Sequence, residues 1–157
     1  MKEIIKKGLV PAMPEGIKIP FAAQGAMPDQ EIGYISEKDI PDIVSKVQNG
    51  TYTSLLLTPN EEDMDEFLMM ESSPELIFLQ IWDGESETDW SSFNPDYLES
   101  NEEAPIECSD GQSVIEMRNT MANTPENREL AAKCAEWYIR TGEPYPGMDW
   151  LREADDL

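Results

Sequence analysis

The stretch ELIFLQIWD (residues 75–83) carries the strongest fold signal in this sequence. Successive side chains of an extended strand point to opposite faces of a sheet. Both faces are apolar here: Leu76, Phe78 and Trp82 share one face with Gln80, and Ile77, Leu79 and Ile81 lie on the other. A strand that is apolar on both faces is predicted to lie in the centre of a sheet covered on both sides.

The sequence on either side predicts further strands. EFLMMES (residues 66–72) is joined to the central strand by Ser73-Pro74, which predicts a hairpin, although EEDMDEFLMM (residues 61–70) also has helical spacing. The β-branched and apolar composition of strands recurs in TYTSLLLT (residues 51–58), APIECS (residues 104–109) and SVIEMRNTM (residues 113–121). The turn Asp110-Gly111 separates the last two segments.

Two segments carry the start and stop signals of helices. Residues 36–48 begin at Ser36, a good N-cap, and residues 125–141 lie between a capping Thr124 and Gly142. Each has apolar residues at helical spacing. The order helix, several strands, helix predicts an α+β fold, with an antiparallel sheet of about four to six strands and these two helices packed on it.

The first part of the chain differs in composition from the rest. Residues 1–31 are rich in Pro and Gly and predict an irregular N-terminal arm, with room for one short strand at residues 17–21. Residues 32–157 predict a single α+β domain, long enough to bury a core. The sequence leaves the oligomeric state open.

The charge of the chain is large and regional. There are 33 acids and 11 bases, for a net charge of −22, and positions 47–117 hold 18 of the acids and no base. Repulsion among this many like charges opposes folding. The excess of acids therefore suggests a function, which is to bind a basic protein partner, to bind a cation, or to mimic a polyanion. Adaptation to high salt is the alternative. Nucleic acid and anionic membrane are excluded as partners because both repel such a surface.

The sequence offers little catalytic chemistry. It contains no histidine, which removes the usual general base and zinc ligand, and it lacks the common phosphate-binding, dinucleotide-binding and nucleophile-elbow motifs. A hydrolase with two carboxylates remains the alternative. Cys108 and Cys134 are expected to be reduced thiols, and no signal or membrane-spanning segment is predicted. We therefore expect a cytoplasmic protein that is not an enzyme and needs no cofactor.

The segment IWDGESETDWSSFNPDYLESNEE (residues 81–103) concentrates eight acids with aromatic residues. A calcium loop is a poor fit, because Thr88 replaces the required Gly and Asn94 the bidentate Glu, so we expect no metal site. Aromatic anchors among acids are typical of a protein interface with a basic partner. The predicted partner-binding residues are Asp83, Glu85, Glu87, Asp89, Trp90, Asp96, Tyr97, Glu99, Glu102 and Glu103.

The C-terminal stretch AAKCAEWYIRTGEPYPGMDW (residues 131–150) resembles the signature of a family of immunity proteins from bacterial polymorphic toxin systems, many encoded beside deaminase-fold toxins. That signature is an amphipathic helix, then Thr-Gly-Glu-x-Pro, then a hydrophobic-acid-Trp close. The matching residues are Trp137, Tyr138 and Ile139, Thr141-Gly142-Glu143, Pro144 or Pro146, and Asp149-Trp150, with an additional Tyr145-Pro146 pair. We expect Trp150 to pack on the scaffold and to take no part in binding.

The resemblance implies that the chain binds and neutralises a cognate toxin that targets nucleic acid. Such toxins bind polyanions and tend to be basic, so an acidic inhibitor can cover the active site without catalysis of its own. The acids of residues 83–103 are expected to face the toxin. The alternative is a DNA-mimic inhibitor of a nucleic-acid enzyme, of the anti-restriction type.

Overall fold

Strand β6 (Leu76–Asp83) organises the sheet. The computed structural model describes residues 2–25, 31–60, 62 and 65–154, and in this part of the chain β6 is the longest strand. It pairs with β5 (Glu66–Ser72) along one edge, and with β8 (Thr120–Ala122) and then β7 (Thr88–Ser91) along the other. The predicted hairpin is confirmed, because Ser72 lies opposite Ile77 and the Ser73 amide donates to the Leu76 carbonyl at 2.9 Å.

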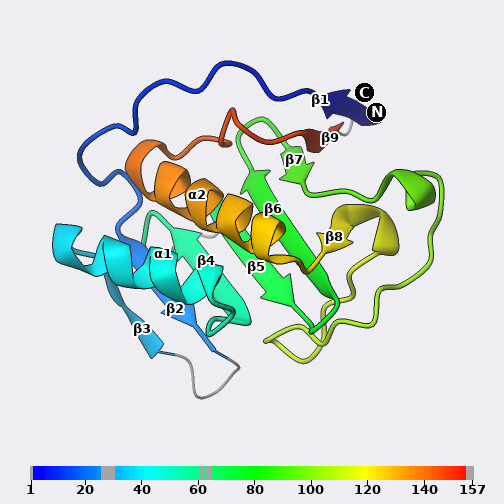
Figure 1. The fold of residues 1–157 in the computed structure, drawn as a ribbon, viewed down its shortest axis with the longest axis horizontal. Helices are drawn as coiled ribbons and strands as arrows, with labels where there is room; N and C mark the ends of the chain where they lie inside the picture. Colours follow the sequence, from blue (N-terminus) through cyan, green and yellow to red (C-terminus); the bar gives the residue numbers. More distant parts are fainter. Residues whose placement is uncertain (1, 26–30, 61, 63–64, 155–157) are drawn as a thin grey trace.

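The described residues form one antiparallel sheet of nine strands, in the order β1-β9-β7-β6-β5-β4-β2-β3 with β8 beside β6 (Figure 1). The remaining strands are β1 (Lys2–Ile5), β2 (Phe21–Gln24), β3 (Glu31–Tyr34), β4 (Ser54–Thr58) and β9 (Trp150–Ala154). The first and last described strands therefore meet at one side of the sheet, where β1 pairs with β9.

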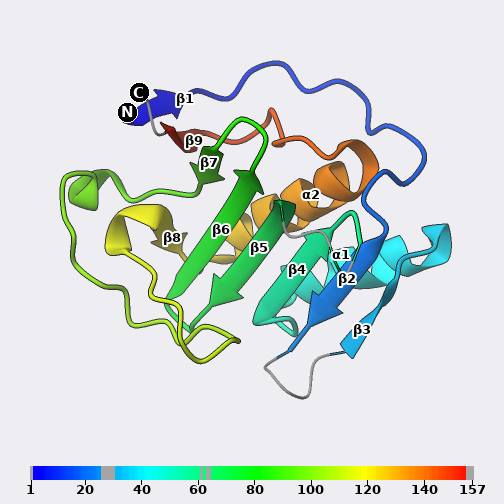
Figure 2. The same ribbon diagram turned by 180° about the vertical axis from the view of Figure 1, so that it is seen from behind.

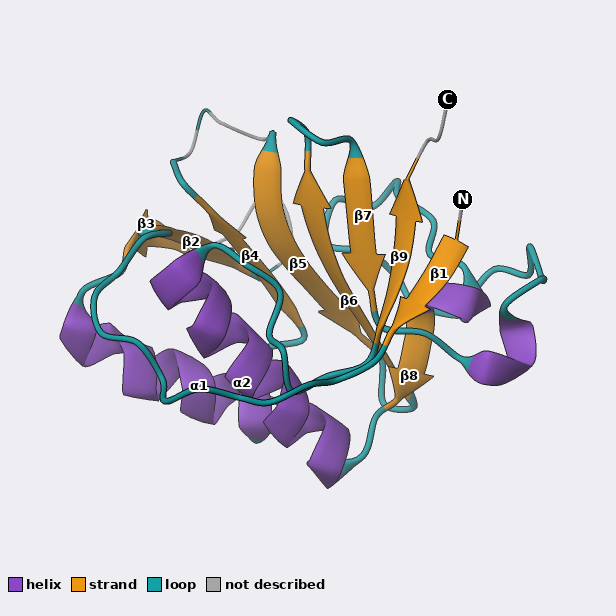
Figure 3. Ribbon diagram, turned by 90° about the horizontal axis from the view of Figure 1, so that it is seen from above, coloured by secondary structure: helices purple, strands orange, loops and turns teal. Residues whose placement is uncertain are grey.

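Both main helices cover the same face of this sheet (Figure 3). Helix α1 (Ile40–Gln48) follows a short 3-10 helix η1 (Glu37–Asp39), in which the Ser36 amide donates to the Asp39 carboxylate at 2.7 Å. Helix α2 (Pro125–Thr141) is capped by the Thr124 hydroxyl and ends at Gly142, whose φ is 72°. The α+β class and the positions of both helices agree with the sequence prediction.

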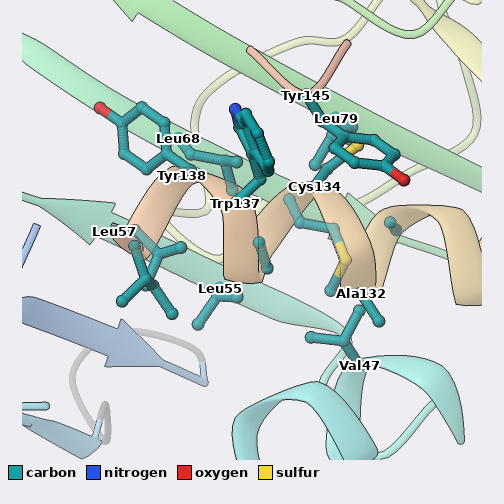
Figure 4. Close-up of a cluster of buried hydrophobic side chains, with 14 of the residues drawn as sticks. Val47, Leu55, Leu57, Leu68, Leu79, Ala132, Cys134, Trp137, Tyr138 and Tyr145 are labelled. Carbon is teal, nitrogen blue, oxygen red and sulfur yellow. The ribbon is translucent and has the colours of Figure 1, made fainter. Parts of the chain in front are cut away.

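The helix-facing side of the sheet contributes most of the core. Leu57 and Leu68 from β4 and β5 pack with Leu79 of β6 against Cys134 and Tyr138 of α2, and all five side chains are buried (Figure 4). This arrangement follows from the alternation in the strands and the apolar stripe of α2.

The other face of β6 is covered at one end by the chain between β7 and β8. Phe78 on that face is buried against Ile106 and Ile115. The prediction of a strand covered on both sides is therefore confirmed for this part of β6. The covering segment itself is not a pair of strands: residues 104–109 and 113–116 form loops, with a 3-10 helix η3 (Met117–Asn119) before β8.

The expected sheet of four to six strands was too small. Residues 1–31 are not irregular throughout, because β1 and β2 lie in them and β2 is hydrogen-bonded on both sides; residues 26–30 of this segment lie outside the described residues. Strands β7 and β9 were also missed. These four strands have only four or five residues each, which is too short for a clear local pattern. For β1 and β9 the partner is also distant in sequence, as in the pairing of Lys2 with Glu153, whereas β7 forms a tight hairpin with β6.

We predict that Leu79→Ala lowers the free energy of unfolding by about 2–5 kcal/mol, because Leu79 is 1% exposed and its truncation leaves a cavity between β6 and α2. Urea unfolding at constant m-value measures the change. Val114→Ala is the control: Val114 is 62% exposed, so its truncation should change stability by less than about 0.5 kcal/mol. Equal effects of the two substitutions would contradict the assignment of the core.

Candidate functional site

The structure divides the predicted acidic segment among four places, the first of which is the end of β6 with residues 81–83. Residues 84–87 form the turn of the β6–β7 hairpin, residues 88–91 form β7 itself, and residues 92–103 form a connection that contains the 3-10 helix η2 (Pro95–Tyr97). The segment is therefore not one loop, and its side chains do not face one direction.

The β6–β7 turn is fixed from within. The Asp83 carboxylate accepts hydrogen bonds from the Glu85 amide at 3.1 Å and the Ser86 hydroxyl at 3.0 Å. The Gly84 amide donates to the Asp65 carbonyl at 2.6 Å, and a Cβ on Gly84 would lie 2.7 Å from that same oxygen. These contacts hold Glu85 and Glu87 in exposed positions, and Glu87 has a positive φ of 52°. The two glutamates are thus presented to solvent on a defined turn.

In β7, Asp89 and Trp90 point to opposite faces of the sheet. Trp90 lies on the helix-facing side, where its ring meets Trp150 edge to face at a centroid distance of 6.5 Å. The Arg152 guanidinium lies over the Trp90 ring at 5.8 Å. Trp90 is partly buried against the core, so its first role is packing.

Asp89 lies on the opposite, helix-free face. Its carboxylate accepts a hydrogen bond from the Gln80 side-chain amide at 2.7 Å. Burial raises the pKa of Asp89; the Gln80 hydrogen bond opposes this effect, and the nearby charge of Glu153 adds to it. Asp89 thus carries its charge at a cost to the folded state.

The remaining acids lie in η2 and in the connection after it. Asp96, Glu102 and Glu103 are exposed, and Tyr97 is partly exposed. Glu99 is exposed and lies 3.7 Å from the ammonium of Lys2, which also donates to the Leu98 carbonyl at 2.8 Å. This connection is therefore tied to β1 at the side of the sheet where the chain ends meet.

Sequence reasoning missed one acid that shapes this region. Glu71 of β5 is only 2% exposed, and its carboxylate accepts hydrogen bonds from the Ser109 hydroxyl at 2.7 Å, the Ser109 amide at 3.1 Å and the Ser54 hydroxyl at 3.0 Å. These bonds hold the 104–116 segment over Phe78. The sequence signal that could have predicted this buried acid is its place in a strand that is otherwise mostly apolar.

A cleft of about 710 Å³ lies on the helix-facing side, between the β6–β7 turn and the turn after α2. Its walls include the predicted residues Asp83, Glu85 and Trp90. Charges in the walls nearly balance: the acids are Glu66, Asp83, Glu85 and Glu143, and the bases are Lys6, Lys18 and Arg152. The cleft is therefore not where the excess of negative charge is concentrated.

The C-terminal motif forms the far wall of this cleft and is held by internal contacts. The Trp150 indole donates to the Tyr145 carbonyl at 2.9 Å, and the Tyr145 ring meets Trp137 at 5.8 Å. A Cβ on Gly147 would lie 2.6 Å from the Tyr145 ring. Trp150 is 1% exposed, so it packs in the scaffold as expected.

Neither cysteine in the described part of the chain is activated as a nucleophile. Burial raises the pKa of Cys108 to about 11 and raises that of Cys134 further, so both thiols stay protonated at neutral pH. The described residues include no group of three or more His, Cys, Asp or Glu side chains placed to hold a metal ion. No described helix is both long and apolar enough to cross a membrane.

Comparison with known proteins finds no matching family model, no similar curated protein and no similar solved structure.

We predict that Asp89→Asn stabilises the free protein at neutral pH. A pKa raised above the unfolded value of about 3.9 means that the folded state binds the proton more tightly, so the contribution of Asp89 is most favourable at low pH and is lost as pH rises through the folded pKa. Asparagine can still accept the Gln80 hydrogen bond. Urea unfolding should give a higher midpoint at pH 7 and a difference that shrinks below about pH 4.

Asp96→Asn is the matched control, because it changes net charge equally at an exposed position. An equal gain in both variants would mean that general self-repulsion, and not the burial of Asp89, determines the effect.

Proposed function

We propose that this chain is an immunity protein that binds a basic toxin domain and blocks its access to nucleic acid. The observation that carries the proposal is a set of exposed acids in the base-free region. Glu85, Glu87, Asp96, Glu102 and Glu103 are all exposed, and none forms an ion pair with a described residue.

The cost of these charges supports a role in recognition. Like charges on one surface repel one another and oppose folding, and this chain places few bases among them. A basic partner would remove that repulsion on binding. The same field would draw the partner in and raise the association rate by about 10- to 1,000-fold at low salt.

The exposed acids lie at two separate places in the chain between β6 and β8, and we assign the binding surface to the first of them, the β6–β7 turn. The β6–β7 turn presents Glu85 and Glu87, and the connection after η2 presents Glu102 and Glu103 (Figure 1). Hydrogen bonds within the turn fix its conformation, so little conformational entropy is lost when a partner binds there. Occlusion of an active site by such a surface needs no catalytic group.

The resemblance of residues 131–150 to immunity proteins supports the choice of partner. That motif lies in the scaffold, so it supports the identity of the fold family and says nothing about which surface binds.

The test uses the product of the gene adjacent to this one. Its expression should arrest bacterial growth, and co-expression of this chain should restore growth. The purified pair should form a complex whose association slows steeply as salt increases. A neighbouring product that is harmless, or growth arrest that this chain does not relieve, would contradict the proposed function.

We further predict that Glu85→Lys/Glu87→Lys slows association with the toxin about 10-fold or more at low salt, because the substitutions reverse charge on the turn that faces the partner. Stopped-flow fluorescence measures the rate. Glu126→Lys/Glu129→Lys on α2 changes net charge by the same amount at exposed positions, and it should slow association much less. Equal slowing by both variants would place the binding surface elsewhere.

A further inference from the structure

The face of the sheet opposite the helices is only partly covered (Figure 2). At one end of β6, the 104–116 segment buries Phe78. At the other end, Trp82 and its neighbour Phe67 on β5 remain partly exposed. Neither ring belongs to a hydrophobic cluster of the described residues, so both offer apolar surface outside the core.

The register of the sheet places these rings in a row with two carboxylates. Phe67 lies opposite Trp82, Trp82 opposite Asp89, and Asp89 opposite Glu153 on β9. Directly opposed residues of antiparallel strands share a face, and their Cβ atoms lie about 4.5–5.5 Å apart. We call these four residues the open-face row. It runs from two aromatic rings to two acids across four strands.

The two acids of the open-face row differ in their hydrogen bonds and ion pairs. Glu153 lies 3.4 Å from the Arg118 guanidinium and accepts a hydrogen bond from the Asn119 amide at 3.3 Å. Asp89 has the single hydrogen bond from Gln80, and none of the ion pairs among the described residues involves it. Asp89 is also desolvated and repelled by Glu153. The row thus holds a charge that a cation would stabilise.

The helix-facing side of the sheet contains an example of a guanidinium held by an indole and a carboxylate. There, the Arg152 guanidinium lies over the Trp90 indole and also pairs with the Glu3 carboxylate. The trio consists of an indole, a guanidinium and a carboxylate on neighbouring strands. In the trio the arginine lies on the strand between the indole and the carboxylate, whereas in the open-face row Trp82 and Asp89 lie directly opposite each other on adjacent strands, so a guanidinium from outside the sheet can reach both.

We propose that the open-face row is a docking site for an arginine of the protein partner, whose guanidinium stacks on Trp82 and pairs with Asp89. Phe67 extends the apolar surface beside the stacked group. Arginine is favoured over lysine because its planar guanidinium stacks on aromatic rings and pairs with a carboxylate through two parallel hydrogen bonds. The large negative charge of the chain complements a basic partner.

The site rests on the proposed function only for the identity of the partner. Its chemistry can be tested on the chain alone, so failure of the two proposals can be told apart. If substitutions in the open-face row leave the toxin complex unaffected, the docking-site proposal is refuted and the immunity function is not. If the open-face row binds arginine but the chain neutralises no toxin, the immunity function is refuted and the docking-site proposal is not.

The experiment titrates the full chain with the peptide Ac-Gly-Arg-Gly-Arg-Gly-NH2 and, separately, with its lysine counterpart. The chain has four tryptophans, so its indole N–H signals in a proton–nitrogen NMR spectrum distinguish Trp82 from Trp90, Trp137 and Trp150. The arginine peptide should shift the Trp82 signal most, and it should bind several-fold more tightly than the lysine peptide.

Asp89→Asn should weaken arginine-peptide binding about 5- to 10-fold, and Trp82→Leu should remove the preference for arginine over lysine. Glu126→Gln, which changes net charge equally at an exposed position on α2, should leave both peptides unaffected. The remaining indole signals report whether each variant is folded. Shifts spread evenly over all four indoles, equal binding of the two peptides, or equal effects of Asp89→Asn and Glu126→Gln would overturn the proposal.

Discussion

Burial of strand β6 is the constraint on which the rest of the structure depends. Its residues Ile77, Leu79 and Ile81 are all at most 3% exposed beneath the helices. On the other face, burial of Phe78 requires a cover, which the chain supplies with the 104–116 segment held by Glu71. That cover ends before Trp82. The open-face row therefore exists because the same strand is covered on one face along its length and on the other face only in part.

Several bases of this acidic chain pair with acids that are distant in sequence. Its few cations join segments that are distant in sequence: Lys2 contacts Glu99, Arg118 contacts Glu153, Arg140 contacts Glu37, and Arg152 contacts Glu3. Three of these pairs lie where β1, β9 and the connection after β7 meet. Acids beside β1 and β9 are thus paired with bases. The acids of the β6–β7 turn and of residues 102–103 are exposed to solvent.

Local patterns in the sequence predicted the elements whose signals lie within one short stretch of chain. The β5–β6 hairpin and α2 follow from alternation, capping and a helix-ending Gly142. Local patterns did not predict strands whose formation depends on a partner distant in sequence. Strands β1 and β9 are examples, because they pair with each other. Ile106 and Ile115 have strand-like surroundings, yet they pack as a loop over Phe78. Exposure of Glu85 and Glu87 was predictable from composition, whereas the adjacency of Phe67, Trp82 and Asp89 needed the register.

The central claim is that the open face of the sheet meets the partner, and side-chain oxidation by hydroxyl radicals tests it most directly. The free chain and the chain in complex with the neighbouring gene product are compared residue by residue. Protection of Phe67, Met69 and Trp82 on binding, with unchanged oxidation of Met13 on the N-terminal segment, is the predicted result. Protection of Met13 with continued oxidation of Phe67 and Trp82 would contradict the account.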